Sequence, residues 1–244
     1  MVESITKEEA KEILDRRPVF NMRLYSHLDD YDRDGFIAYK HKSALLLVSW
    51  SLGLTADDPQ DIIPLIEHIP RDRNLFIPGL EVRILDELSK HVKGLDIDEY
   101  CYTFTLDEPL EEKMYLDSLT ISDAEFVNEY WTFKSDDSLP FIRSCIESLP
   151  SSVIKDDDGN YIAWSICYHE SPYHINMGSL FVLPEHRRSG LGRKITLDLT
   201  RKVFDKNRKP LVDIFEDNIA SQSLVTSLGF KKHGKVRFGT LRSE

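Results

Sequence analysis

The sequence has few cysteines and no long apolar run. Its three cysteines, Cys101, Cys145 and Cys167, are an odd number and lie far apart without metal-like spacing. They predict free thiols in a reducing compartment. No stretch of 18 apolar residues occurs, which argues against a membrane-spanning helix. Residues 1–18 mix acidic and basic side chains without an apolar core, unlike a secretory signal or a mitochondrial presequence. The cytoplasm is therefore the expected compartment.

Positive charge is also in short supply. The chain has 31 Lys and Arg residues against 42 Asp and Glu residues, a net charge of -11. Nucleic acids and anionic membranes bind basic surfaces, so neither is an expected partner. With 244 residues, of which 41% are hydrophobic, the chain can bury the core of one large domain or of two small ones. Small molecules are the expected ligands, and the oligomeric state is not predictable.

One stretch runs against this acidic balance. Residues 180–183 (LFVL) are apolar, Pro184 follows, and an Arg- and Gly-rich turn then opens a helical pattern. The pattern predicts a buried strand, a turn and a helix. Gly190 and Gly192 lack a Cβ atom, so the backbone can direct several N–H groups toward one point at the positive end of the helix. A pyrophosphate would fit there, with arginines gripping its oxygens.

The spacing of this turn, Arg187-x-x-Gly190-x-Gly192, resembles the [QR]-x-x-G-x-[GA] coenzyme A signature of the GNAT acyltransferase superfamily. Its place between a strand and a helix is the context that the signature needs. A basic helix start with two turn glycines is the alternative, and the absence of G-x-G-x-x-G disfavours a dinucleotide site. The predicted coenzyme A residues are Phe181, Val182, Leu183, Arg187, Arg188, Ser189, Gly190, Leu191, Gly192, Arg193, Lys194, Asn218 and Ser221.

Periodicity divides the chain at a charged, Pro-containing segment, residues 106–113. Residues 1–112 are predicted as a smaller α/β domain with helices over 6–18, 59–67 and 79–92 and strands over 19–24, 44–50 and 101–106. Residues 113–244 predict strands over 114–119, 153–154, 161–169, 174–183, 211–215 and 230–238, and helices over 122–130, 136–148, 219–228 and after 190. The second order is that of the GNAT fold, an α/β (α+β) fold with a mixed twisted sheet flanked by helices.

Two acidic segments have simpler interpretations than metal sites. Residues 30–37 (DYDRDGFI) match the first eight positions of an EF-hand loop. Position twelve is His41, which cannot supply the two oxygens of a Glu, and the flanking patterns are those of strands. The run Asp156-Asp157-Asp158 precedes Gly159 between two strand patterns. Both segments are predicted to be turns, and no metal is expected.

Further segments extend the resemblance. Residues 218–230 (NIASQSLVTSLGF) are similar to the GNAT pattern N-x-x-[AS]-x-x-x-Y-x-x-x-G-F, with Val225 where the family has a Tyr that protonates the departing thiolate. PVFNMRLYSHLDD, EFVNEYWTF, FIRSCIESLP and VLPEHRRSGLG resemble, in that order, segments of the glycine N-acyltransferase-like family. The resemblance implies a family-specific N-terminal domain and a catalytic GNAT domain that moves an acyl group from coenzyme A to an amino acid nitrogen.

The general base is where the sequence departs from this family. The resemblance places a Glu eight residues before Pro184, where this chain has Asn176, which cannot usefully take a proton. His174, Glu170 and Glu216 are the other candidates, with a chain of waters as the alternative. A bulge or splay in the strand that ends at residue 183 is predicted to free backbone N–H groups, chiefly that of Val182, for the thioester carbonyl and the pantetheine amides.

The sequence thus predicts an acyl-CoA-dependent N-acyltransferase acting by direct attack on glycine or another small amino acid, with acyl-CoA, acetyl-CoA included, as its cosubstrate. A non-catalytic acyl-CoA-binding pseudoenzyme is one alternative, because Asn176 and Val225 replace family residues. The other is a GNAT enzyme that acetylates protein amines, which the acidic surface would suit. The family resemblance also leaves a mitochondrial location open.

Overall fold

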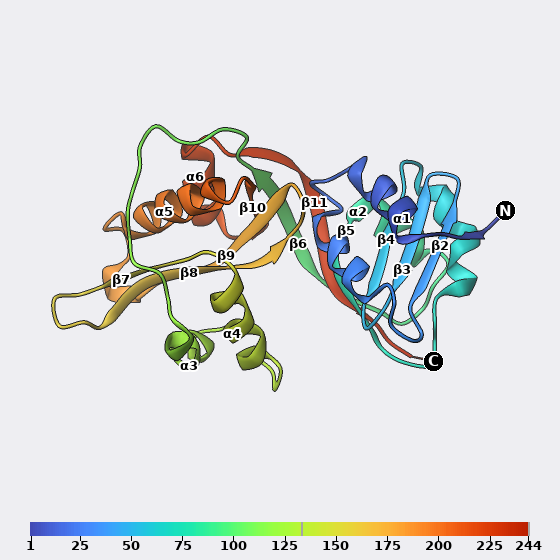
Figure 1. Cartoon of the computed structure of the whole chain (residues 1–244), viewed down its shortest axis with the longest axis horizontal. Coiled ribbons are helices and arrows are strands. Elements are labelled where there is room, and N and C mark those ends of the chain that lie inside the picture. The colour runs from blue at the N-terminus through green and yellow to red at the C-terminus, as the bar shows by residue number, and fades with distance from the viewer. Residues whose placement is uncertain (133, 244) are drawn as a thin grey trace. The chain divides into compact units, whose positions relative to one another are not determined.

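A computed structural model describes residues 1–132 and 134–243 (Figure 1), so Phe133 of the EFVNEYWTF segment and Glu244 lie outside the described residues. The first of two compact units comprises Met1–Thr103, Ile214–Asn218 and the chain from Lys232 on, and the second comprises Phe104–Asp213 and Ile219–Lys231. Three strands belong partly to each unit: β6 (Leu95–Thr105), β10 (Lys209–Phe215) and β11 (Lys231–Leu241). The predicted domains over 1–112 and 113–244 stay a prediction.

The first unit begins with a helix whose start is fixed by its sequence. Helix α1 (Lys7–Asp15) follows Thr6, whose hydroxyl accepts the N–H of Glu9 at 3.2 Å. The Glu9 carboxylate accepts the N–H of Thr6 at 2.9 Å. Each side chain thus satisfies a backbone donor that the first helical turn leaves without a partner. The predicted helix start at Thr6 is confirmed.

Replacing Thr6 with alanine should lower the free energy of unfolding by about 1 kcal/mol, because the Glu9 N–H loses its acceptor. Urea denaturation followed by circular dichroism would measure the change. Thr226→Ala is the matched control, since Thr226 is exposed within a helix rather than at its start. Equal stabilities for the Thr6→Ala variant and the wild type would contradict the capping role.

An antiparallel sheet carries the core of the first unit. Its strands pair in the order β1 (Glu3–Ser4), β2 (Ile37–His41), β3 (Ala44–Val48) and β4 (Leu52–Thr55). All of β3 is buried, which agrees with its continuous apolar sequence. Strand β5 (Leu75–Glu81) pairs antiparallel with β11. The remaining elements are the 3₁₀ helices η1 (Met22–Asp30) and η2 (Pro59–His68) and the helix α2 (Val82–Ser89).

Two predictions for the first unit were wrong. Residues 19–24 are not a strand: the N–H of Asn21 donates to the Arg17 carbonyl, and η1 begins at residue 22. Local bonds of this kind outcompete pairing with a distant strand. The predicted helix over 79–92 is limited to α2, because residues 79–81 belong to β5, which pairs with β11. Residues 30–37 form the end of η1, a turn and the start of β2, as an acidic turn requires.

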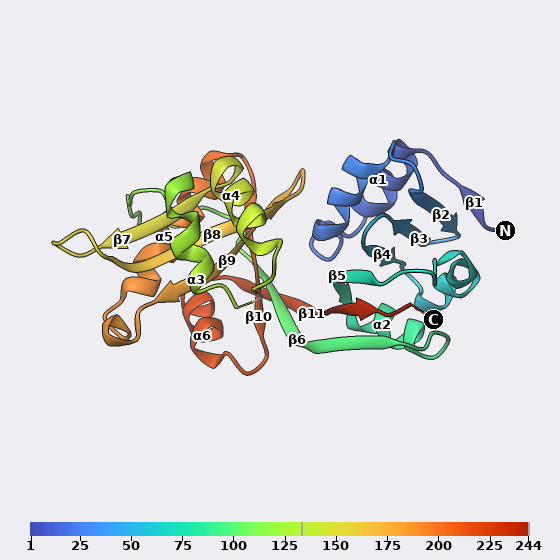
Figure 2. The same ribbon diagram turned by 90° about the horizontal axis from the view of Figure 1, so that it is seen from below.

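From residue 121 onward, the helices and strands follow the predicted order. The mixed sheet of the second unit pairs β7 (Ser151–Lys155), β8 (Tyr161–Glu170) and β9 (His174–Val182) antiparallel, and β9 pairs parallel with β10. Helix α5 (Leu191–Asp205) covers one face of this sheet, and α3 (Ala124–Glu129) and α4 (Ser138–Ser148) cover the other (Figures 1 and 2). Helix α6 (Ile219–Ser227) follows β10, and short 3₁₀ turns, η3 (Ile121–Asp123) and η4 (Pro184–His186), precede α3 and α5. The predicted α/β class with a mixed, helix-flanked sheet is confirmed.

The strand predicted over residues 114–119 was wrong, and a buried carboxylate holds this segment in place. These residues form only an isolated bridge between Asp117 and Val153. Instead, Asp198 of α5, fully buried, accepts the N–H of Leu116 at 3.2 Å and the Ser152 hydroxyl at 2.6 Å. Arg201 and Lys202 complete its shell, each at 2.7 Å. The segment is therefore held by side chains rather than by a strand ladder.

No helix among the described residues is both long and apolar enough to cross a membrane.

Candidate functional site

Strand β9 contains the predicted bulge. Its pairing with β8 runs Ile166 with Gly178 and then Trp164 with Phe181, so Ser179 and Leu180 together lie opposite one residue, Ser165. Ser179 has φ 48°, a left-handed conformation that costs energy for any residue but glycine. The irregularity lies three residues from the position at which the sequence predicted free N–H groups.

Strands β9 and β10 also diverge. Their parallel pairing is limited to His174–Asn176 with Lys209–Leu211, although both strands continue beyond it. On the other edge of β9, the Leu183 N–H donates to the Ile162 carbonyl of β8 at 3.0 Å. Because successive N–H groups of a strand alternate in direction, that of Val182 points away from β8, toward the side from which β10 has departed. A polar backbone edge is thus available where β9 ends.

Backbone conformation turns the chain from β9 into α5. Gly190 caps the helix with φ 83°, and Arg188 has φ 60°. A Cβ atom at Gly190 would have no neighbour within 4 Å, so glycine is required there by its backbone conformation and not by crowding. Gly192 is ordinary in φ, and a Cβ atom there would make normal contacts with Leu180 and Leu224. The open space before α5 fits an anion bound to the first N–H groups of the helix.

The basic side chains around this turn differ in their surroundings. Arg187 donates from Nε to the Val182 carbonyl at 3.0 Å and lies over the Phe181 ring. Arg193 instead pairs with Glu112 at 2.6 Å, an ion pair whose side chains are 42% and 55% exposed. Such an exposed pair is weak, so a phosphate can compete for the guanidinium. The exposed members of the predicted set are Arg187, Arg188, Ser189, Gly190, Lys194 and Asn218.

The apolar members of the predicted set offer backbone rather than side chains. The Phe181 ring stacks on Trp164 with centroids 4.8 Å apart and belongs to the aromatic packing under α3. Phe181, Val182, Leu183 and Leu191 are all partly buried. The turn that we call the anion cradle, residues 187–194, therefore offers an anion chiefly backbone N–H groups and mobile cations.

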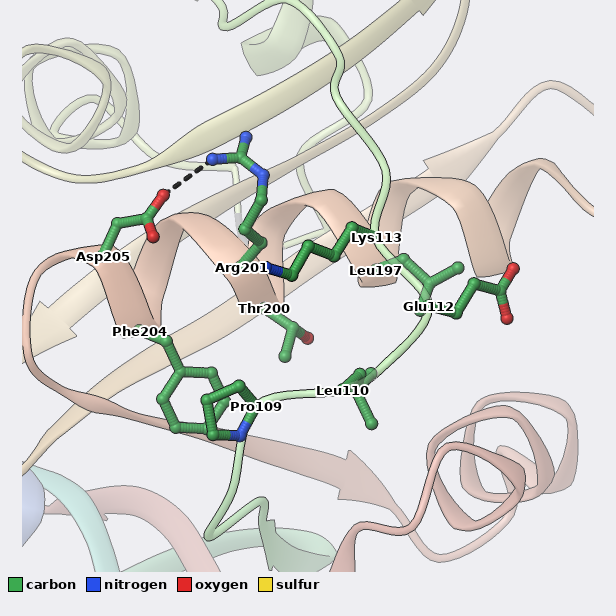
Figure 3. A pocket seen from close by; sticks show the side chains of 9 residues that line it. All are labelled: Pro109, Leu110, Glu112, Lys113, Leu197, Thr200, Arg201, Phe204 and Asp205. Atoms are coloured by element: carbon green, nitrogen blue, oxygen red, sulfur yellow. Dashed lines mark hydrogen bonds and ion pairs between the residues drawn. The ribbon is translucent and has the colours of Figure 1, made fainter.

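A pocket of about 210 Å³ lies beside α5 but away from the anion cradle (Figure 3). One wall is the 109–113 segment with Pro109 and Leu110, and the other is the middle and end of α5, with Leu197 and Phe204. Arg201 and Asp205 pair with each other across its rim at 2.7 Å. Its lining includes no residue from the end of β9, so it is not the predicted site.

The candidate bases occupy unlike places. His174 is 4% exposed at the start of β9, and Glu170 pairs with Arg208 at 3.3 Å on the surface. Glu216 belongs to the first unit, where Lys235 and the Tyr102 hydroxyl bond to it and lower its pKa. Stabilisation of the charged form makes a carboxylate a weaker base. Geometry thus favours none of the three, and their roles stay predictions.

Asn176 has a partner that the sequence did not reveal. It is fully buried, and its Nδ2 donates to Oδ2 of Asp213 on β10 at 2.9 Å. Asp213 lies two residues beyond Leu211, the partner of Asn176 in the strand register, so both side chains share one face of the sheet. No sequence pattern links residues 37 positions apart, and only the parallel register brings this carboxylate to the position of the family Glu.

The second predicted motif is divided between the units. Asn218 lies in the turn before α6, with its N–H donating to the Phe215 carbonyl, and belongs to the first unit. Ser221 lies in α6 and is half-buried. Val225, at the family Tyr position, is 5% exposed and packed in the second unit. It offers no proton to a leaving thiolate.

One stretch of the chain matches a known protein family. Residues 153–238 match the family described as FR47-like protein. Mouse glycine N-acyltransferase is 32% identical over 120 residues, a match that covers 48% of this chain and 39% of the mouse protein. The predicted resemblance to the GNAT superfamily and to glycine N-acyltransferase-like proteins is confirmed, and the chain covers well under two thirds of these relatives.

Solved structures show which fold the chain has. A Drosophila protein matches with a TM-score of 0.70 at 19% identity over 98% of both chains. An acetyltransferase of the GNAT family from Colwellia psychrerythraea matches with a TM-score of 0.60 at 11% identity, over 99% of this chain and 100% of that one. The predicted GNAT fold is confirmed.

Proposed function

We propose that this chain is an acyl-CoA-dependent N-acyltransferase that transfers an acyl group to the amino group of glycine or another small amino acid. The end of β9 leads into the anion cradle at α5, and this continuity is the observation that carries the proposal. The cradle would hold the pyrophosphate of coenzyme A through helix N–H groups and the cations of Arg187, Arg188 and Lys194. Similarity to glycine N-acyltransferase supports the amino acid acceptor.

The diverging strands provide for the rest of the cosubstrate. An extended pantetheine arm carries amides that can pair with the open edge of β9, beginning at the N–H of Val182. The same edge supplies hydrogen-bond donors for the thioester carbonyl, whose oxygen becomes negative as the amine attacks. Coenzyme A leaves as the thiol, and no metal is required by this chemistry.

A specific observation favours one alternative, a non-catalytic acyl-CoA-binding protein. Asn176 stands where the family has Glu, and Val225 is buried where the family has Tyr. Both side chains lack the acid–base chemistry of the residues that they replace. Thiol release from a panel of acyl-CoA donors, acetyl to benzoyl, with pooled amino acids as acceptors, separates the two functions. Release that depends on an acceptor supports the transferase, and tight binding without release supports the alternative.

Gly190→Asp should weaken acyl-CoA binding by about 100-fold or more. A side chain there enters the space before α5, its charge repels phosphate, and the loss corresponds to one or two charge-assisted hydrogen bonds. Isothermal titration calorimetry with acetyl-CoA would measure the affinity.

Gly159→Asp is a closely matched control for Gly190→Asp. Gly159 has φ 84° against 83° at Gly190, and a Cβ atom there also has no neighbour within 4 Å. Both variants pay the same backbone strain, but Gly159 lies in the hairpin turn between β7 and β8. Unchanged acetyl-CoA affinity in the Gly190→Asp variant, or an equal loss in both variants, would count against the anion cradle.

A further inference from the structure

We infer that Asp213 is the general base of the transfer and that Asn176 positions both this carboxylate and the attacking amine. The inference rests on the proposed function and assigns a residue that sequence reasoning did not select. It starts from the hydrogen bond between Asn176 Nδ2 and Asp213 Oδ2, 2.9 Å long, which joins β9 to β10 at the point where these strands separate.

The chemistry of the pair fixes the orientation of the amide. An ionised carboxylate only accepts hydrogen bonds, so the NH₂ group of Asn176 must face Asp213. The amide oxygen, Oδ1, is then directed elsewhere. It is buried and has no hydrogen-bond partner among the described protein residues. A buried acceptor left in this state costs about 1–3 kcal/mol, so a ligand that donates an N–H to it gains that energy back.

Two acceptors of different kinds thus meet on one face of the sheet: the neutral oxygen of Asn176 and the carboxylate of Asp213. An amine is the ligand that suits both, because it can donate one N–H to each. Asp213 is only half-buried, so its carboxylate is within reach of a small molecule. The face is that of α3 and α4, because the Asn176 register partner on β8, His169, lies near the ring of Phe141 on α4.

The length of β9 shows how far Asn176 and Asp213 lie from the expected path of the pantetheine arm. Six residue steps separate Asn176 from Val182, and because the bulge takes up one of them, about 17 Å of extended strand remains. The extended pantetheine arm of coenzyme A can span such a length, so a cosubstrate bound at the anion cradle can bring its sulfur to the point of strand divergence. Tyr168 lies over Gly178, where a Cβ atom would stand 2.0 Å from its ring.

The proposed step is balanced without any further reactant. The amine nitrogen forms a bond to the thioester carbonyl carbon, and the nitrogen becomes more acidic as that bond forms. Asp213 then takes one proton from the nitrogen, which at this stage is acidic enough to protonate a carboxylate. The carbon–sulfur bond breaks, and the thiolate of coenzyme A takes up one proton. The products are the amide and the free thiol.

The test compares three variants with the wild type in a steady-state assay of thiol release, using the donor and amino acid that the wild type uses best. Asp213→Asn should lower kcat by about 100-fold or more with the acyl-CoA dissociation constant within twofold of the wild-type value. The exchange variant Asn176→Asp/Asp213→Asn keeps one carboxylate and one amide in the same hydrogen bond and moves the carboxylate to the family position. The kcat of this exchange variant should be at least tenfold higher than that of Asp213→Asn. Asp217→Asn, an exposed carboxylate beyond β10, is the control and should retain full kcat.

Three other outcomes would overturn the inference, and the measurements distinguish them. Asp213→Asn with at least half of the wild-type kcat excludes Asp213 as the base while leaving the transferase intact. A loss of kcat that the exchange variant does not reverse, although both variants melt at the wild-type temperature and bind acyl-CoA, excludes a role for the carboxylate at this place. A wild type that binds acyl-CoA without acceptor-dependent thiol release refutes the proposed function itself, and the role of Asp213 falls with it.

Discussion

Asp198→Ala should lower the free energy of unfolding by about 3–5 kcal/mol, the cost of removing one member of a buried ionic network. Asp198 is fully buried, and its carboxylate bonds to Arg201 and Lys202 at 2.7 Å and to the Ser152 hydroxyl at 2.6 Å. Alanine leaves two largely buried cations without their counter-charge and the Leu116 N–H without its acceptor. Guanidinium chloride denaturation would measure the loss.

Asp205→Ala provides the control on the same helix. Asp205 also pairs with Arg201 at 2.7 Å, but its side chain is 65% exposed. An exposed ion pair contributes at most about 1 kcal/mol, so this variant should stay close to the wild type. Similar small losses in both variants would mean that water, rather than the network, holds the 114–118 segment against α5.

Lowering the pH from 6.5 to 4 should cost the protein about 3 kcal/mol of stability through His27 alone. His27 is 2% exposed, and burial lowers its pKa from 6.5 to about 4, against the weaker opposing effect of Asp30. The unfolded chain binds a proton at this imidazole below pH 6.5, whereas the folded chain does so only near pH 4. The stabilisation is therefore complete above pH 6.5 and is lost as the pH falls toward 4.

Urea denaturation at several pH values would isolate this contribution by comparison with His27→Gln. Glutamine can still bond to the Ser51 hydroxyl, which lies 2.9 Å from the imidazole Nε2, but it does not titrate. The difference between wild type and variant should shrink by about 3 kcal/mol from pH 6.5 to 4. His233→Gln, at an exposed site, should show no such change. Parallel stability curves for wild type and His27→Gln would refute the prediction.

Local signals in the sequence were sufficient for much of the fold. The capping pair of Thr6 and Glu9, and the turn before Gly190, act over three or four residues, so the sequence alone displays their geometry. The strand predicted over 114–119 failed for the opposite reason. Its alternation is real, but its partners are the side chains of α5, and the buried Asp198 that binds them is more than 80 residues away.

The same difference between local and long-range contacts decides which parts of the candidate site were predictable. The anion cradle was predictable because a glycine with positive φ and a helix start are adjacent in sequence. The Asn176–Asp213 hydrogen bond was not, since it depends on the parallel register of β9 and β10 and on the place where that register ends. The sequence identified Asn176 as a departure from the family but gave no sign of the neighbouring carboxylate.

The extra residue of the bulge in β9 reverses which face of the sheet each later side chain of the strand occupies. Met177 and Phe181 are four residues apart, and an unbroken strand would direct both side chains to the same face. Here Met177 accepts a hydrogen bond from Thr200 of α5, while Phe181 stacks on Trp164 on the opposite face. The same residues in a strand without the bulge would place Phe181 on the face of Met177 and turn the Val182 amide toward β8. The same extra residue therefore sets the packing of an aromatic ring and the direction of a backbone N–H, and neither could be altered by evolution or by design without the other.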